Sequence, residues 1–402
     1  MRAAVVGVGE TRYTKWGGIT DQSEFSLACK AILNALNDAG LTPDDVDGLC
    51  SFAGDRNEAI LVAQALGIPE LRFADLVWLP GGGGAPASVG HAALAVDFGR
   101  AEVVVAYRSL CQGQFVRFGA GPDQVWPKVE RGFLVARDLV EAEFGWMIPY
   151  GVYNATTGMA MIVRRHMHLY GTTTEQMGRV AVAIRANANR NPRAVMHDRT
   201  MTLTDHANSP MVADPLRRFD CCLESDGACA VVVTTPERAR DLPKKPVDVL
   251  GFAEGPAHRY GYGGFANHNL PEDDYPTGGG RLVADRLWRD TGVSPQDVDV
   301  AQIYDHYTGM VLLQLEDFGF CKRGEAGPFV ADGNIDFPNG SLPITTSGGG
   351  LSEAYVHGLN HVVEGVRQLR GESTSQLTNP ETCLVTGAAG VPASALLLGA
   401  GR

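Results

Sequence analysis

Hydrophobic positions follow two alternating periods along the chain. Short apolar, often β-branched runs of the kind that a sheet buries occupy residues 5–8, 48–52, 71–78, 102–107, 228–234, 247–252 and 298–303. Between them, apolar residues recur at helical spacing over residues 22–37, 58–66, 85–96, 156–170, 174–189 and 310–318. Because strands that alternate with helices form largely parallel sheets covered on both faces, the pattern predicts an α/β fold.

Three stretches interrupt this pattern. Residues 109–153 and 255–280 are rich in glycine and aromatic residues and are expected to be irregular, while residues 236–246 combine charge and proline as linkers do. The interruptions divide the chain into a predicted N-terminal half, residues 1–240, and a predicted C-terminal half, residues 245–402. The first half would carry an inserted loop region at about residues 110–220.

One ten-residue segment occurs twice. The sequence DAGLTPDDVD at residues 38–47 returns as DTGVSPQDVD at residues 290–299, with six identities in ten. Each copy follows an amphipathic helix, carries a glycine that stops the helix and a proline that starts a turn, and leads into a strand. This repeat predicts two related halves, with the functional site where the halves meet.

Composition narrows the function classes. The 402 residues include 45% hydrophobic and 20% charged residues, and the net charge of −12 argues against nucleic acid or anionic membrane as a partner. No apolar run reaches membrane-spanning length and the N-terminus lacks a signal-peptide pattern, so we expect a cytoplasmic protein. The eight cysteines form no CxxC pair, which favours reduced thiols and no metal site.

Two glycine-flanked turns concentrate the polar chemistry. Residues 302–309, QIYDHYTG, place Tyr304, Asp305 and His306 between a predicted strand and a predicted helix, where open α/β sheets bind ligands. Residues 347–358, SGGGLSEAYVHG, carry Tyr355 and His357. A phenol has a pKa of about 10, so it acts as a base only beside a cation. The residues alone leave open whether the tyrosines perform acid–base catalysis or pack with solvated hydroxyls.

Other motifs favour less specific interpretations. The stretch GVG at residues 7–9 follows a strand as a dinucleotide fingerprint does, but its third glycine is missing. The run of four glycines at residues 81–84 lacks the Lys-Ser/Thr of a phosphate loop and offers no nucleophile, although its backbone N–H groups could hold a thioester oxygen or pyrophosphate. Cys111 and Cys383 lie in or beside strand patterns and are interpreted as structural.

Several stretches together resemble the thiolase superfamily, in its sterol-carrier-protein (non-specific lipid-transfer-protein) branch. They are residues 3–11 (AAVVGVGET), 99–106 (GRAEVVVA), 215–228 (PLRRFDCCLESDGA), 304–307 (YDHY) and 347–350 (SGGG). The resemblance extends over nearly the whole chain. It implies two duplicated halves that form a five-layer α/β/α/β/α sandwich, and a tight homodimer.

The departures from the thiolase pattern concern the reactive residues. The acyl-accepting cysteine of a thiolase matches a position near Gly82, and Tyr304 replaces the histidine of the branch's His-Asp-Cys-Phe motif. The Gly-His-Pro motif has become residues 354–358, AYVHG, and Leu384 takes the place of the second cysteine. The resemblance therefore implies a cysteine-independent enzyme.

These replacements are similar to those in the steroid side-chain aldolases of bacterial sterol and bile-acid catabolism, which carry a tyrosine at both turns. The implied reaction is retro-aldol cleavage of a 17-hydroxy steroid C22 acyl-CoA to a 17-keto steroid and propionyl-CoA. Tyr355 would be the base and Tyr304 the acid, although these roles could be exchanged. The supporting residues would be Asp305, His306 and His357, and the backbone N–H groups of Gly82 and Gly387 would hold the thioester oxygen.

The resemblance also implies a separate acyl-CoA-binding partner with an OB-fold and a zinc ribbon. No cofactor is expected beyond the CoA thioester of the substrate itself. One alternative is a lyase for another β-hydroxyacyl- or β-ketoacyl-CoA, and another is a non-catalytic acyl-CoA- or lipid-binding scaffold with the same fold.

Overall fold

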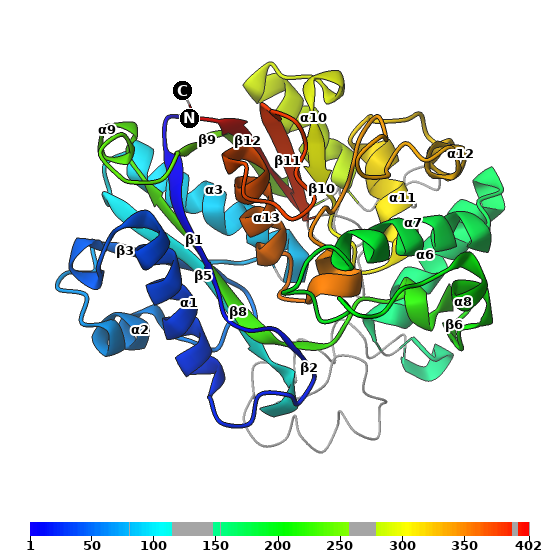
Figure 1. The fold of residues 1–402 in the computed structure, drawn as a ribbon, viewed down its shortest axis with the longest axis horizontal. Helices are drawn as coiled ribbons and strands as arrows, with labels where there is room; N and C mark the ends of the chain where they lie inside the picture. The colour runs from blue at the N-terminus through cyan, green and yellow to red at the C-terminus, as the bar shows by residue number, and fades with distance from the viewer. Residues whose placement is uncertain (80, 115–147, 153, 257–278, 388–392, 402) are drawn as a thin grey trace.

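A computed structural model describes residues 1–79, 81–114, 148–152, 154–256, 279–387 and 393–401 (Figure 1). Most of the two stretches expected to be irregular, residues 109–153 and 255–280, lies outside the described residues. Within the residues that the structure describes, no helix combines the length and apolarity that crossing a membrane demands.

The main strands form one large sheet in the order β4-β3-β5-β8-β1-β9-β12-β11-β10. The strands of its N-terminal half are β1 (Ala4–Glu10), β3 (Gly48–Phe52), β4 (Phe73–Val77), β5 (Val103–Cys111) and β8 (Ser225–Thr234). Those of its C-terminal half are β9 (Val247–Gly255), β10 (Val300–Gln302), β11 (Thr382–Gly387) and β12 (Ala393–Ala400).

The two halves of the sheet repeat one topology. In the order β4-β3-β5-β8-β1, the first two pairings are parallel and the last two antiparallel. A parallel bridge from Ile344 to Ala301 of β10 starts the second half, which continues as β10-β11-β12-β9 with the same sequence of pairings. The half-sheets join where β1 pairs with β9. The predicted duplication is therefore confirmed in the strand order itself.

The two half-sheets and the helices that cover them form five layers (Figure 1). Helix α1 (Glu24–Ala39) packs on the outer face of the N-terminal half-sheet, and α3 (Gly84–Asp97) and α13 (Leu359–Arg370) lie between the half-sheets. Helices α10 (Gly280–Thr291) and α11 (Thr308–Asp317) cover the far face of the C-terminal half-sheet. The predicted α/β/α/β/α sandwich is confirmed.

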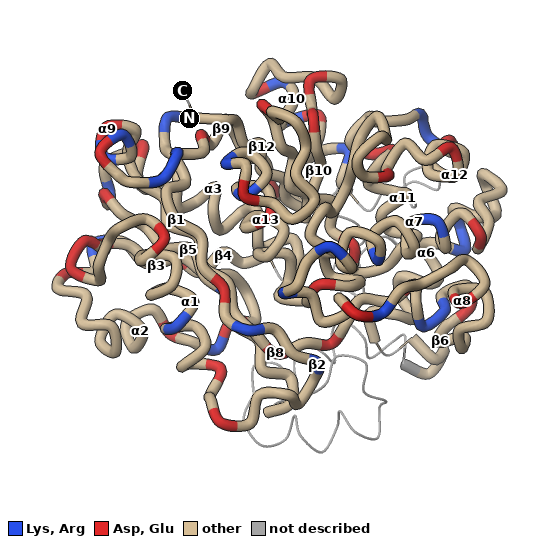
Figure 2. The backbone as a smooth tube through the Cα atoms, viewed as in Figure 1, with Lys and Arg blue, Asp and Glu red and all other residues tan. Residues whose placement is uncertain are grey.

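Strand alternation explains why three separate hydrophobic cores form. In β12, Leu396 and Leu398 point into the central core with α3 and α13, whereas Leu397 points into the outer core with α10 and α11. Helices cover both faces of the half-sheets, so most of their strands are apolar on both sides, whereas the edge strand β4 is partly exposed. Charged residues accordingly lie mainly on the outer helices and loops (Figure 2).

The repeated segment performs the same task in both halves. Helices α1 and α10 end at Gly40 and Gly292, whose φ angles of 73° and 69° lie in the left-handed region that favours glycine. The last residue of each copy then accepts backbone hydrogen bonds at the start of the strand that neighbours the following one in the sheet: Asp47 from Glu102 and Val103 at β5, and Asp299 from Glu381 and Thr382 at β11. The repeat is thus a matched pair of helix stops and strand caps.

The structure extends two strands beyond their apolar runs. Strand β5 continues to Cys111 and β8 starts at Ser225, and the two pair antiparallel over this extension, with Cys111 opposite Asp226. The pairing adds the polar residues Arg108 and Ser109 to a buried strand, which the hydrophobic pattern did not predict. Residues 236–246, predicted as a linker, contain the short helix α9 (Pro236–Ala239).

The chain forms further helices and short strands besides these elements. The helices are α2 (Ala59–Leu66), α6 (Ala155–Tyr170), α7 (Thr174–Ala188), α8 (Leu203–Asn208) and α12 (Ala326–Ala331). The short strands are β2 (Thr14–Lys15), β6 (Met211–Ala213) and β7 (Leu216–Arg217). One π-helical turn, Gly349–Glu353, precedes Tyr355 and is called the π-turn below.

A histidine on the central helix α3 bridges the two half-sheets. The ring of His91 contacts the carboxylates of Asp75 on β4, at 2.6 Å, and Glu254 on β9, at 3.0 Å. These two hydrogen bonds, with Asp75 the larger influence, raise the pKa of His91 to about 9. The protonated imidazole therefore connects α3 to one strand of each half.

This bridge predicts a pH dependence of stability. Because the pKa of His91 is higher in the folded than in the unfolded protein, its stabilisation is fully present below pH 6.5 and is lost as the pH rises through about 9. We expect the unfolding midpoint of the wild type to fall more between pH 6.5 and 10 than that of His91→Gln, measured by denaturant titration. Parallel pH curves for the two proteins would contradict the assignment.

Candidate active site

The two tyrosine turns meet at a single hydrogen bond. Tyr304 follows β10 and Tyr355 follows the π-turn, and their hydroxyl oxygens lie 2.8 Å apart. The Tyr304 side chain is buried, whereas Tyr355 is partly exposed. The structure therefore brings together the two phenols that were singled out from the sequence as candidate acid and base.

The glycine run before α3 makes room for the Tyr304 ring. A Cβ atom built on Gly82 would lie 2.1 Å from Cζ of Tyr304, far inside contact distance. A Cβ on Gly387, at the end of β11, would in turn lie 2.1 Å from the carbonyl oxygen of Gly82. Of the two candidate oxyanion glycines, Gly82 thus borders the Tyr304 ring and Gly387 borders Gly82. The ring fills space beside the position at which the thiolase resemblance places a cysteine.

A closed set of hydrogen bonds fixes the backbone of Tyr304. Its N–H donates to Oγ1 of Thr386 (3.0 Å), and that hydroxyl donates to Oε1 of Gln314 (2.6 Å). The Gln314 amide then donates to the Tyr304 carbonyl at 2.7 Å. Because these residues belong to β11 and α11, the turn is held by both of its neighbours.

Asp305 holds the second turn against the first. Its buried carboxylate accepts hydrogen bonds from the backbone N–H groups of Gly350 (2.7 Å) and Leu351 (3.0 Å) in the π-turn. Nε2 of His361 on α13 lies 3.1 Å from the same carboxylate. Asp305 therefore positions the turn that carries Tyr355.

His306 lies against the face of Tyr304. The two rings are stacked, with centroids 4.6 Å apart and planes inclined by 25°. The segment before β8 passes over both turns, because the N–H of Cys222 donates to the His306 carbonyl and the N–H of Leu223 to the Gly350 carbonyl, each at 2.9 Å. His306 thus shapes one wall of the site.

Burial keeps both phenols protonated. It is the largest of the effects that raise the pKa of Tyr304 and of Tyr355 above the ordinary value. The hydrogen bond between them shifts the two pKa values in opposite directions, lowering that of Tyr304 and raising that of Tyr355. A free phenolate is consequently unfavourable in this site at neutral pH.

Arg108 is a buried cation behind Tyr355 that the sequence pattern did not predict as a site residue. Its guanidinium is 1% exposed and lies 3.5 Å from the Asp55 carboxylate. Nη2 donates to Nδ1 of His357 at 2.8 Å, which leaves the imidazole proton on Nε2. Burial and the charge of Arg108 lower the pKa of His357 well below the usual value, so the ring stays neutral. A charge directly after an apolar run was the available sequence signal.

His357 extends this arrangement towards the tyrosines. Its ring meets Tyr355 edge to face, with centroids 5.2 Å apart. Its φ of 51° lies in the left-handed region, which is uncommon for a residue with a side chain and marks a backbone held by its surroundings. The residues Arg108, His357 and Tyr355 therefore form one contiguous line of contacts.

The weaker motifs have structural explanations. Gly7 and Gly9 lie inside β1, where Cβ atoms would come 2.2 Å from the backbone of α1, so these glycines serve close strand–helix packing and not a dinucleotide. Burial raises the pKa of Cys111 to about 11 and also raises that of Cys383, as expected of structural thiols. The described residues contain no cluster of three or more His, Cys, Asp or Glu side chains suited to a metal ion.

Comparisons with known proteins identify a matching family and similar enzymes. Residues 271–398 match the family "Thiolase C-terminal domain-like". The chain is 45% identical to 17-hydroxy-3-oxo-4-pregnene-20-carboxyl-CoA lyase of Mycobacterium tuberculosis over 400 residues, 99% of each protein. It is 44% identical to steroid side-chain-cleaving aldolase of Thermomonospora curvata over 406 residues, 100% of this chain and 98% of that protein.

The chain belongs to the thiolase superfamily. A solved structure, Ltp2-ChsH2(DUF35) aldolase, superposes with a TM-score of 0.89 at 42% identity and covers 100% of this chain and 98% of that one. Within the superfamily, the chain is similar to a steroid side-chain-cleaving aldolase and to a 17-hydroxy-3-oxo-4-pregnene-20-carboxyl-CoA lyase, the type of enzyme that the sequence resemblance implied. The predicted relationship is therefore confirmed.

The close approach of Gly82 to Tyr304 can be tested by stability measurements. We expect Gly82→Ala alone to lower the unfolding free energy by about 1–3 kcal/mol, because the new methyl group overpacks against the ring. In a Tyr304→Ala background the same substitution should cost much less, since the ring is gone. Denaturant unfolding of the two single variants and the double variant measures this coupling, and simple additivity of the costs would contradict it.

Proposed function

We propose that this protein is a retro-aldol carbon–carbon lyase that cleaves a 17-hydroxy steroid C22 acyl-CoA to a 17-keto steroid and propionyl-CoA. The observation that carries the proposal is the hydrogen-bonded pair Tyr304–Tyr355, which lies where the two half-folds meet and beside the glycine at the position matching the thiolase cysteine. Two relatives of similar length and about 45% identity bear names for this type of reaction.

The tyrosine pair suits a proton relay. Retro-aldol cleavage moves one proton from the tertiary hydroxyl of the substrate to the α-carbon of the departing thioester enolate. Tyr355 would accept the hydroxyl proton as its own proton passes to Tyr304, and Tyr304 would protonate the enolate. Because the protein gains no net charge, the relay avoids the free phenolate that burial disfavours.

The surrounding groups would stabilise the enolate oxygen. The backbone N–H groups of Gly82, which borders the Tyr304 ring, and of Gly387, which borders Gly82, would take this role, as would the Nε2–H of neutral His357. No acyl-enzyme is formed in this scheme, so we further propose that the reaction requires no cysteine and no cofactor.

Replacing either phenol by phenyl tests the relay. We expect Tyr304→Phe and Tyr355→Phe each to lower kcat for propionyl-CoA release about 100-fold or more, because each removes one proton carrier without changing the ring. The substrate should still bind, as judged by equilibrium titration.

Cys222→Ala provides the matched control, since Cys222 lies beside the same turns and the proposed chemistry does not use its thiol. This variant, and wild type treated with iodoacetamide, should retain cleavage. Unchanged turnover in both phenylalanine variants, or loss of activity on alkylation, would refute the mechanism.

Arg108 gives a second test through pH. Removing its charge in Arg108→Met should raise the pKa of His357 towards its usual value, lower kcat by about tenfold, and add a loss of activity at acidic pH as His357 becomes protonated. Arg108→Lys keeps a cation and should retain the wild-type pH profile. A fall in kcat with an unchanged profile would assign Arg108 to packing alone.

We also propose two associations. The edge strand β4 leaves its outer side unpaired in the described structure and exposes Leu76 (59%) and Trp78 (55%) around it, which suits a homodimer interface. A partner of the DUF35 type is supported by the solved relative, whose name, Ltp2-ChsH2(DUF35) aldolase, includes ChsH2(DUF35). The chain carries no CxxC pair, so a zinc ribbon would belong to that partner.

A further inference from the structure

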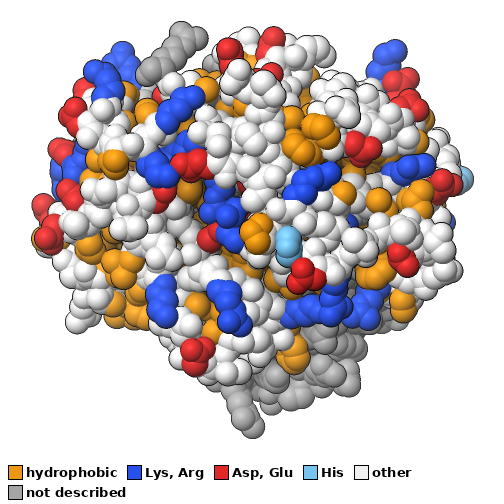
Figure 3. Space-filling model, in the orientation of Figure 1, with side chains coloured by type: hydrophobic (Ala, Val, Ile, Leu, Met, Phe, Trp, Pro, Cys, Tyr) orange, Lys and Arg blue, Asp and Glu red, His pale blue; other side chains and the backbone are white. Residues whose placement is uncertain are grey.

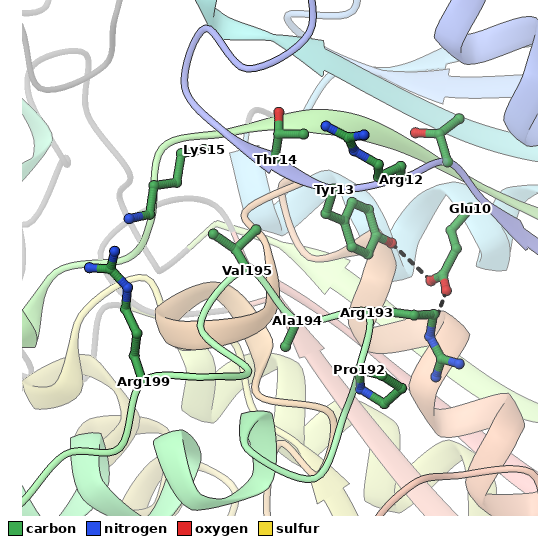
Figure 4. A pocket seen from close by; sticks show the side chains of 11 residues that line it. Glu10, Arg12, Tyr13, Thr14, Lys15, Pro192, Arg193, Ala194, Val195 and Arg199 are labelled. Carbon is green, nitrogen blue, oxygen red and sulfur yellow. Dashed lines mark hydrogen bonds and ion pairs between the residues drawn. The ribbon is translucent and has the colours of Figure 1, made fainter.

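A cavity lies on the side of the π-turn that is hydrogen-bonded to Val195 and Met196. It has a volume of about 920 Å³ and lies between the segment that follows β1 and residues 192–199 (Figure 4). Its lining residues are Glu10, Thr11, Arg12, Tyr13, Thr14, Lys15, Pro192, Arg193, Ala194, Val195 and Arg199.

The cavity is cationic in a protein of net charge −12. Among its lining residues, Glu10 is the one carboxylate, and it is already paired with Arg193 (2.8 Å) and Arg367 (2.9 Å). The side chains of Lys15 and Arg199 extend towards one another at one end of the cavity (Figure 4) and form no ion pair with any described residue. Lys and Arg side chains also lie around the centre of the face drawn in Figure 3.

A buried cation reinforces this excess of positive charge. Arg185 is 5% exposed, and within the described structure it donates to Oγ of Ser352 (2.8 Å) and to the carbonyl of Arg199 (3.1 Å) but to no carboxylate. Burial, together with the charge of Arg199, lowers the pKa of Arg185 to about 10. A buried cation without a counter-charge is unfavourable, and an anion in the cavity would supply one.

The rest of the lining suits a ligand larger than a simple anion. Tyr13 contributes an aromatic surface, and Pro192, Ala194 and Val195 contribute apolar ones. The volume matches the usual range of small-molecule sites, about 300–1,000 Å³. Nη2 of Arg193 is buried and has no hydrogen-bond acceptor among the described residues. Arginine and lysine together favour phosphate groups.

We propose that this cavity binds a phosphate-bearing ligand of nucleotide size, with Lys15 and Arg199 holding the phosphates. Two backbone hydrogen bonds connect its wall to the catalytic turn: Val195 N–H donates to the Glu353 carbonyl (2.9 Å) and Met196 N–H to the Ser352 carbonyl (3.1 Å). Through these bonds and Arg185, an occupied cavity restrains the turn that carries Tyr355.

Direct binding to the full-length protein tests the site. Adenosine 3′,5′-bisphosphate is the probe, and isothermal titration measures its Kd in wild type, Lys15→Gln and Arg199→Gln. We expect each substitution to weaken binding about tenfold, and the wild-type affinity to fall as salt rises. Lys15→Arg should restore binding, and Arg100→Gln, which removes an exposed cation outside the cavity, should leave it unchanged.

Two results would overturn the proposal. One is the absence of bisphosphate binding to wild type up to millimolar concentration. The other is equal affinity in wild type and in both glutamine variants, with all proteins shown to be folded by their unfolding midpoints. Because binding is measured without turnover, failure of the proposed lyase activity would not affect this test.

Kinetics then distinguish two sources of the phosphate, both of which support the site. If the bisphosphate competes with acyl-CoA and Lys15→Gln raises KM with kcat unchanged, the ligand is the nucleotide end of the substrate's own CoA; this outcome rests on the proposed function. If the bisphosphate changes kcat without competition, the ligand is a separate molecule that acts through the π-turn.

Discussion

The contact between Gly82 and the Tyr304 ring is the constraint on which the active site depends. The start of α3 and the ring occupy adjoining space, and no side chain fits at position 82 while the ring is in place. A nucleophilic side chain at position 82 and a tyrosine at position 304 are therefore mutually exclusive in this geometry. Because position 82 is a glycine, the Tyr304 ring fits beside it and places a second phenol next to Tyr355, with the two hydroxyl oxygens 2.8 Å apart.

The protonation states of the site residues follow mainly from their burial. Burial raises the pKa values of both phenols and lowers that of His357, so all three groups are neutral at physiological pH. The positive charge of Arg108 lies on the other side of His357 from Tyr355 and close to the Asp55 carboxylate. Its hydrogen bond to Nδ1 sets the tautomer of His357. Neutral donors and acceptors in a low dielectric suit a reaction that moves a proton without separating charge.

Sequence patterns predicted the features that local chemistry encodes. The duplication was visible because each copy of the segment ending at Asp47 or Asp299 needs the same glycine stop and the same capping carboxylate. Arg108 was not predicted because an apolar run indicates a strand only as far as its first polar residue. Its hydrogen-bond partner His357 is also 249 positions away in the chain, so no local pattern connects the two. The amide hydrogen bonds of Asp305, which could equally have capped a helix, likewise require a turn 45 residues later in the chain.

The π-turn is hydrogen-bonded to the candidate active site on one side and to the wall of the cationic cavity on the other. On one side, the Asp305 carboxylate accepts from the N–H groups of Gly350 and Leu351. On the other, Ser352 accepts from Arg185 through its hydroxyl and from Met196 through its carbonyl. The first set of bonds belongs to the buried active site, whereas the second includes Arg185, a buried cation that has no carboxylate partner among the described residues. The turn that carries Tyr355 is therefore restrained from both sides, and under our proposal an anion beside Arg185 would strengthen the second restraint.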